Sequence, residues 1–276
     1  MFYKTDLYLL QCLTNLHAGS GDSTYGIVDK EVQKDPIMEL PVIHASSMKG
    51  AFRELFEFHH NQSIEYIFGS DSKAEGSEAD SKRMKAGQYF FMEARLLFLP
   101  VRSNRKPFFF ATSTEILQGF VEAQEDFGAG NKNALKEALA PLLTRNPQKG
   151  RPVIFSNEAG IVYLDEFEAQ LEASIPLSLG DWPSDGSNIA IFHHDDLTEV
   201  AKRLPVIARN YLENGISGNL WYEEVVPRYT MFYFFVSRPD DNDAFENQIK
   251  DDKIKYKVQI GGNASVGYGL CKLLKF

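Results

Sequence analysis

Runs of apolar residues predict strands near both ends of the chain and at several points between them. The segment 2–13 is rich in leucine and aromatic residues, which are typical of a strand. In 254–260, apolar residues alternate with Lys255, Lys257 and Gln259, which indicates a half-buried strand. Further strands are predicted over 88–101, 108–111, 153–155, 161–164, 189–192 and 228–237.

Three segments have the 3.6-residue apolar period of a helix. The first covers 46–56, where Ser46 or Ser47 is expected to cap the helix. The second covers 131–143, and the third covers 197–211 with an expected kink at Pro205. Because strands and helices alternate irregularly with long connections, the fold class is predicted to be α+β.

One segment has the composition of a mobile insertion in an otherwise single domain. Residues 70–87 contain neither an aromatic nor a β-branched side chain, so little apolar surface is available to order them. The remaining chain has the size and composition of one large domain, so we predict a single domain over 1–276.

Charge and cysteine content exclude several classes of protein. The net charge of −9 argues against a free-standing, non-specific nucleic-acid binder, although it allows a local basic groove. Cys12 and Cys271 form no CxxC pair, so a structural zinc site is not expected, and two cysteines are compatible with a reducing cytoplasm. There is no signal-peptide pattern and no apolar run of about 18 residues, so a cytoplasmic protein without a membrane partner is predicted.

Two segments have the residue types of a phosphate-binding site. Four glycines lie within 261–269, directly after a predicted strand, so its backbone N–H groups could surround an anion or form only a tight β-turn. Ser47 lies at a predicted helix start, and Lys49 and Arg53 share one helical face. That face could bind phosphate or could simply be solvated.

Other residues are candidates for catalysis. His17 precedes a glycine-rich stretch, and Asp29 follows it; a lone aspartate can be a general base or a metal ligand but is usually a turn or surface carboxylate. Tyr222 and Glu223 adjoin Trp221, where either base stacking and catalysis or a loop anchored by a buried tryptophan is possible.

Taken in order, the motifs of this chain resemble those of the RAMP proteins of CRISPR systems. More narrowly, the chain is similar to the RNA-cleaving backbone subunits of type III-B (Cmr) effector complexes, over residues 3 to 275. The matching motifs are His17-x-Gly19-x-Gly21, Val28-Asp29, Pro41-Val42-Ile43-x-x-Ser46-Ser47-x-Lys49-Gly50-x-x-Arg53, Ile67-Phe68-Gly69 and Gly261-Gly262-x-x-x-Val266-Gly267-x-Gly269.

The resemblance implies a fold and an assembly. The expected fold is a modified ferredoxin-like (RRM-like) core with large insertions, one of them a β-hairpin thumb at about 157–174. Copies of the chain would stack along a CRISPR RNA together with other Cmr subunits. Target RNA paired to this guide would be cleaved at regular intervals, which would serve antiviral defence.

The resemblance also implies roles for individual residues. The catalytic aspartate of the family matches Asp29, while the residues expected near RNA are His17, Ser47, Lys49, Arg53, Gly262, Asn263 and Ser265. Tyr222 and Glu223 are expected as secondary catalytic or stacking residues. One carboxylate is too few for an all-protein two-metal site, so we expect a divalent cation, Mg²⁺, to bind weakly and to keep much of its water. The sequence does not identify the ligands of this cation.

Two alternative functions stay open at this point. The chain could be a non-catalytic RNA-binding strut in a complex whose cleavage activity resides elsewhere. It could also be a CRISPR-repeat RNA processing nuclease of the same superfamily that uses His17 as a general acid and base without a metal.

Overall fold

The computed structural model describes most of the chain, namely residues 3–22, 26–70, 85–130, 132–156, 160–174, 179 and 188–276. Large sheets and helices occur together in these ranges, so the predicted α+β class is confirmed. Most of the predicted insertion 70–87 lies outside them, but its ends meet, because Ser70 N donates to Lys85 O at 3.0 Å. No helix in the described ranges is long and apolar enough to cross a membrane.

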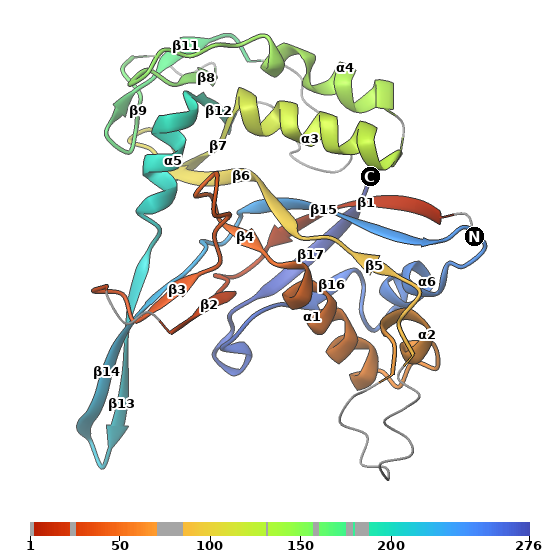
Figure 1. The fold of residues 1–276 in the computed structure, drawn as a ribbon. Helices are drawn as coiled ribbons and strands as arrows, with labels where there is room; N and C mark the ends of the chain where they lie inside the picture. Colours follow the sequence, from red (N-terminus) through yellow and green to blue (C-terminus); the bar gives the residue numbers. More distant parts are fainter. Residues whose placement is uncertain are drawn as a thin grey trace.

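One large sheet runs through the middle of the molecule (Figure 1). Its centre has the strand order β6-β15-β1-β17, and neighbouring strands there are antiparallel. β1 lies between two strands from the C-terminal part, since Leu9 pairs with Tyr233 on one side and with Leu274 on the other. These strands are β1 (Tyr3–Cys12), β6 (Ala94–Arg102), β15 (Met231–Pro239) and β17 (Leu270–Lys275).

The sheet extends beyond its centre on both sides. β16 (Lys257–Gln259) forms one edge next to β17. Beyond β6 follow β7 (Phe108–Ser113), β12 (Ile189–Phe192), β8 (Val153–Phe155) and β11 (Gln170–Glu172), while β4 (Val42–Ile43) pairs with β6 and β5 (Phe90–Phe91) with β15.

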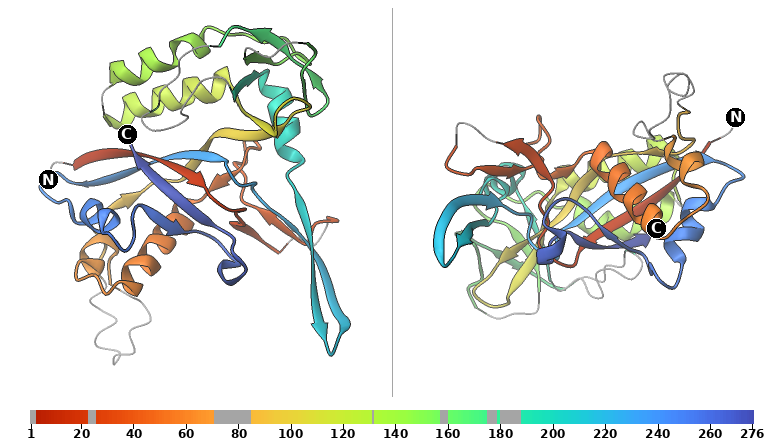
Figure 2. Two further views of the ribbon diagram at one scale, coloured as in Figure 1. Left: turned by 180° about the vertical axis from the view of Figure 1, so that it is seen from behind. Right: turned by 90° about the horizontal axis from the view of Figure 1, so that it is seen from below.

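Helices cover both faces of the sheet (Figure 2). Successive strand residues point to opposite faces, and the ring of Phe52 in α1 stacks on Phe234 at 5.9 Å, whereas Phe120 in α3 packs on Tyr233 at 4.5 Å. α1 (Ala45–Phe58), α2 (Ile64–Phe68) and α6 (Ala244–Lys250) therefore lie on one face, and α3 (Thr114–Phe127) and α4 (Lys132–Leu143) on the other. The helices predicted over 46–56 and 131–143 are confirmed.

The two cysteines, which are far apart in sequence, lie directly opposite each other on β1 and β17. Cys12 pairs with Cys271, and both side chains are fully buried free thiols. A hydrogen bond with Cys12 and burial both raise the pKa of the Cys271 thiol well above its ordinary value. The pair therefore behaves as part of the apolar core.

A second sheet carries a long hairpin that projects from the body (Figures 1 and 2). Its order is β13-β14-β3-β2. The hairpin consists of β13 (Val206–Glu213) and β14 (Ile216–Glu224); β14 pairs with β3 (Lys30–Val32), which in turn pairs with β2 (Gly19–Asp22).

The helix predicted over 197–211 is wrong in its second half. α5 (His194–Lys202) ends ahead of Pro205, and the chain then enters β13, where Arg209 pairs with Trp221 of β14. Proline lacks an N–H group and disfavours the helical conformation in the residue before it. The apolar residues beyond Pro205 therefore belong to a strand, although their spacing also fits a helix.

The expected thumb position at 157–174 differs from that of the projecting hairpin. Residues 157–159 lie outside the described ranges, and β9 (Tyr163–Leu164) and β10 (Phe167–Glu168) form a short hairpin whose Leu164 is fully buried. β11 then joins the main sheet, with Leu171 opposite Ile154. The described part of 157–174 is thus attached to the body, and the hairpin that projects from it lies at 206–224.

Candidate functional site

Segments from distant parts of the chain meet at the base of the projecting hairpin. They are the residues that follow β1, the start of β3, the end of β14 and the glycine-rich loop 261–269, which joins β16 to β17. This place brings together His17, Asp29 and Glu223, which the sequence had indicated separately.

Asp29 is fixed beside β14 by two hydrogen bonds. Its backbone N–H donates to Tyr222 O at 3.0 Å, and Tyr222 N donates to the Asp29 carboxylate oxygen Oδ2 at 2.7 Å. The side chain is nevertheless exposed. The protein therefore holds one carboxylate at a defined place on an open surface, next to the half-exposed ring of Tyr222.

His17 lies behind this surface with only 7% of its area exposed. Its Nδ1 donates to Glu224 O at 2.7 Å, because a carbonyl oxygen can only accept. Its Nε2 lies 3.5 Å from Glu223 Oε1. These contacts fix the ring between β14 and the chain segment that follows β1.

Glu223 links the hairpin to the glycine-rich loop. The side chain is 2% exposed, and its Oε1 accepts a hydrogen bond of 2.8 Å from Asn263 Nδ2. Arg209 of β13 approaches Oε2 at 3.6 Å and also lies over the ring of Tyr268. Oε2 accepts no hydrogen bond from the described residues, so Glu223 is buried with incomplete compensation.

Glu224 anchors the other side of the hairpin base. Lys34 Nζ lies 2.9 Å from its Oε1, and Val32 N donates to its Oε2 at 3.1 Å. Sequence reasoning missed Glu224, Lys34 and Arg209. The only available signal was the pair of adjacent glutamates, Glu223 and Glu224. Adjacent side chains on a strand point to opposite faces of the sheet, so two buried glutamates each need a separate partner.

The glycine-rich loop packs against the backbone next to His17. Gly261 has φ of +78°, and a Cβ there would lie 2.3 Å from His17 O. Gly262 N donates to the same oxygen at 2.9 Å. Asn263 adopts a left-handed conformation and reaches Glu223, whereas Ser265 is exposed in a short 3₁₀ turn, Ala264–Val266.

The start of α1 is tied to the same region through a glutamine. Gln33 Nε2 donates to Ser47 Oγ and to Gly19 O, both at 3.0 Å, and Gln33 Oε1 accepts from His44 N. The expected capping by Ser46 or Ser47 is wrong, because His44 is the N-cap and makes no side-chain capping bond.

Of the two cations predicted on α1, one is already engaged within the chain. Arg53 Nε contacts Glu57 at 2.7 Å, and its Nη1 donates to Gly69 O. Lys49 is half-buried and forms no ion pair with the described residues. Lys49 therefore remains the cation of α1 that is available to an external anion.

Asp29 is the residue of this site that could hold a metal ion. The described residues include no group of three or more His, Cys, Asp or Glu side chains arranged to hold a metal ion. An exposed carboxylate suits Mg²⁺, which usually keeps several waters and takes further ligands from substrate phosphates. The residues present therefore fit a weakly bound ion rather than a preformed all-protein cage.

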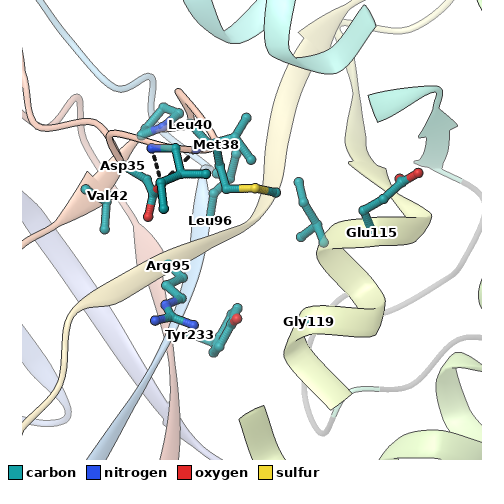
Figure 3. A pocket seen from close by; sticks show the side chains of 12 residues that line it. Asp35, Met38, Leu40, Val42, Arg95, Leu96, Glu115, Gly119 and Tyr233 are labelled. Atoms are coloured by element: carbon teal, nitrogen blue, oxygen red, sulfur yellow. Dashed lines mark hydrogen bonds between the residues drawn. The ribbon is translucent and has the colours of Figure 1, made fainter. Parts of the chain in front are cut away.

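An apolar cavity lies elsewhere, between the 35–42 loop, β6 and α3 (Figure 3). It has a volume of about 310 Å³, and its lining includes Met38, Leu96, Arg95 and Tyr233. None of the predicted site residues lines it. The surface around Asp29 is exposed, which suits an extended ligand better than a small molecule.

Comparisons with known proteins give a consistent result over the whole chain. A model of the RAMP superfamily matches residues 9–272. The CRISPR system Cmr endoribonuclease Cmr4 of Pyrococcus furiosus is 31% identical, covering 98% of this chain and 95% of that protein. The CRISPR system Cms endoribonuclease Csm3 of Enterococcus italicus is 35% identical, but over 31% of this chain and 45% of that protein.

Solved structures share the fold at lower sequence identity. A subunit of a type III-B Cmr-beta complex bound to cognate target RNA superposes with a TM-score of 0.77 at 23% identity, covering 98% of this chain and 96% of the other. Oligomeric Cmr4 from Pyrococcus furiosus gives a TM-score of 0.64 at 23% identity, with coverages of 99% and 98%.

Proposed function

The chain belongs to the RAMP superfamily, and on that premise we propose that it is a backbone subunit of a type III-B CRISPR effector complex. In this role it binds CRISPR RNA and cleaves complementary target RNA at regular intervals. Its partners are the two RNAs, further copies of itself and other Cmr subunits. The observation that carries the proposal is the fixed, exposed carboxylate of Asp29 at the base of the projecting hairpin.

The strand order supports a ferredoxin-like core. The elements follow along the chain as β1, α1, β6, β15, α6 and β17, and the four strands lie in the order β6-β15-β1-β17. This is the split βαβ arrangement of that core, with two helices on one face. The remaining elements, including β13 and β14, are then insertions.

The projecting hairpin is our candidate for the thumb. Its two strands bear exposed apolar side chains, among them Tyr211, Ile216 and Leu220. Its base is held to the body through Glu223 and Glu224. A hairpin that projects into solvent and is fixed at its base is able to separate stacked nucleotides at a constant distance from Asp29.

Asp29 is placed to act on a nucleotide displaced by the hairpin. Displacement frees the neighbouring ribose from A-form geometry, so its 2′-OH can align with the adjacent phosphorus, a near-attack arrangement worth several kcal/mol. The 2′-oxygen bonds to phosphorus as the P–O5′ bond breaks, Asp29 takes or orients the 2′-OH proton, and solvent protonates the leaving oxygen. A divalent cation held by Asp29, expected to be Mg²⁺, would offset charge on the phosphate.

The test compares two carboxylates on the same segment. Asp29→Asn should abolish cleavage of guide-complementary RNA in the assembled complex without preventing assembly. Glu31→Gln is the control, since Glu31 lies two residues away and forms no ion pair with the described residues. The parent complex should give evenly spaced products that disappear when a chelator is added.

The alternative functions predict other outcomes. Undiminished cleavage by the assembled Asp29→Asn complex would show that Asp29 is not catalytic and would favour a non-catalytic strut. Cleavage of precursor RNA by the isolated chain, insensitive to chelator, would favour repeat processing. The His17 ring is buried and its Nδ1 donates to Glu224 O, which speaks against its use as a freely accessible acid or base in that reaction.

A further inference from the structure

Two lysines lie directly opposite each other at the edge of the large sheet. Lys257 of β16 pairs with Lys272 of β17, and both side chains are exposed. Their neighbours Val258 and Cys271 are buried on the opposite face of the same strands. Both lysines therefore point away from the α1 side of the sheet.

The hydrogen-bond pattern shows that this pair is a close one. Ile260 N donates to Gly269 O, and Leu273 N donates to Tyr256 O, so the hydrogen-bonded rungs fall on even-numbered residues of β16. The Lys257–Lys272 rung is consequently a non-hydrogen-bonded pair, in which the two Cα atoms are only about 4.5 Å apart. The two ammonium groups thus extend from one narrow strip.

This arrangement costs stability and is not compensated within the described chain. Like charges directly opposite on a sheet are destabilising. Neither Lys257 nor Lys272 forms an ion pair with a described residue, although the chain carries 38 acidic residues and a net charge of −9. By contrast, Lys275 on the same strand contacts both Asp6 and Glu246.

A third lysine adds to the strip. Lys255, with a left-handed φ of 49°, lines a cavity of about 370 Å³ together with Lys272, Tyr256 and Lys275. Lys255 also lacks an ion-pair partner among the described residues. We call Lys255, Lys257 and Lys272 the lysine strip.

The lysine strip adjoins the candidate site along the chain. The Lys257–Lys272 pair is separated by two residues along each strand from the Gln259–Leu270 pair, next to which the loop 261–269 joins β16 to β17. At about 3.3 Å per strand residue, the separation along the strands is about 7 Å. A polyanion that contacts this loop is therefore within reach of the strip.

We propose that the lysine strip is a binding site for the phosphate groups of single-stranded RNA, separate from the contacts predicted on α1 and in the loop. Lysine binds phosphate as a point charge and does not read sequence. An external polyanion would relieve the Lys257–Lys272 repulsion, which no described acidic side chain relieves. The proposal rests on the proposed function only in supplying RNA as the polyanion.

Salt-dependent binding of target RNA to the assembled complex tests the proposal. We compare the parent with Lys257→Gln/Lys272→Gln and with a control of equal charge change, Lys4→Gln/Lys136→Gln, whose lysines are exposed on β1 and α4. Loss of two phosphate contacts lowers the salt slope by about 1.4. Between 50 and 200 mM salt the strip variant should therefore lose about sevenfold less affinity than the parent.

Thermal unfolding of the same variants provides the second measurement. The strip variant should unfold at a higher temperature than the parent because a repulsive pair has been removed, while its RNA affinity at low salt falls. Unchanged salt slope, or a loss of another protein subunit from the complex in place of RNA, would overturn the proposal. Cleavage that depends on Asp29 would persist in that case, so the proposed function would stand without the strip.

Discussion

Replacing Glu223 should destabilise the candidate site, because this side chain joins the hairpin to the glycine-rich loop. The Glu223→Ala variant lacks the carboxylate and therefore the hydrogen bond from Asn263, which is worth about 1.5–3 kcal/mol for a charged acceptor. The variant also loses the ion-pair contact with Arg209, whose side chain is 21% exposed, and such a contact contributes about 0.2–1 kcal/mol. Because Oε2 is buried without a hydrogen bond, removing it recovers some desolvation cost, and we expect a net loss near 2 kcal/mol.

Hydrogen exchange measures this loss where it occurs. A local destabilisation of 2 kcal/mol raises exchange about 30-fold, since 1.4 kcal/mol corresponds to tenfold, and the increase should be confined to peptides covering the loop 261–269 and the end of β14. Glu223→Gln keeps an acceptor for Asn263 and should show a smaller effect. Glu213→Ala, at the exposed hairpin tip, is the control. If the loop 261–269 exchanges its amide hydrogens at the same rate in Glu213→Ala and Glu223→Ala, then Glu223 does not join the hairpin to the loop.

The remaining predictions concern stability and are measured by thermal, denaturant or pH-dependent unfolding. Gly261→Ala should destabilise the protein far more than Gly267→Ala. Both glycines have a positive φ, but of the two only a Cβ at Gly261 would collide with backbone, 2.3 Å from His17 O. Equal effects of the two substitutions would contradict the close packing of the loop. Phe52→Ala should cost about 3–5 kcal/mol of unfolding free energy, since the ring is fully buried among other aromatic rings, whereas the equivalent change at Phe58, which is 78% exposed, should cost little. Burial opposes ionisation of Glu246, but hydrogen bonds from Tyr8 and Lys250 outweigh it and hold its pKa below the ordinary value of 4.5. Because the pKa of Glu246 is lower in the folded state, its ionised carboxylate stabilises the protein at pH values above 4.5. The free energy of unfolding should therefore fall as the pH drops below about 4.5, and Glu246→Gln should make this pH dependence weaker.

The strands at both ends of the chain were predictable because their side chains contribute to one continuous core. Residues 2–13 and 228–237 form long apolar runs, and they become adjacent strands of the large sheet. The hairpin was not predictable in the same way. Its first strand continues the apolar spacing of α5 and is exposed on most positions, so no burial pattern separates the strand from a helix.

The candidate site was predictable in its residue types but not in its connections. The sequence indicated His17, Asp29, Glu223 and the glycine-rich loop as separate features, and the structure places them together. Gln33 and the other residues that join these segments carry no local signal. Their role depends on tertiary contacts, some between distant positions such as Lys34 and Glu224, which are 190 residues apart, and periodicity and composition do not describe such contacts.

The position of β1 in the middle of the sheet has a consequence for how the protein is made. β1 is synthesised before both of its neighbours, β15 and β17, so after Cys12 has been made it waits for more than 200 further residues. At typical rates of translation this delay is roughly 10 to 45 s. During that time Leu7, Leu9 and Leu10 have no partner strand, and the nascent chain is open to chaperones and proteases. A prematurely terminated chain that lacks β17 would leave β1 with a permanently unpaired edge, so cellular quality control should remove it before it enters an assembly.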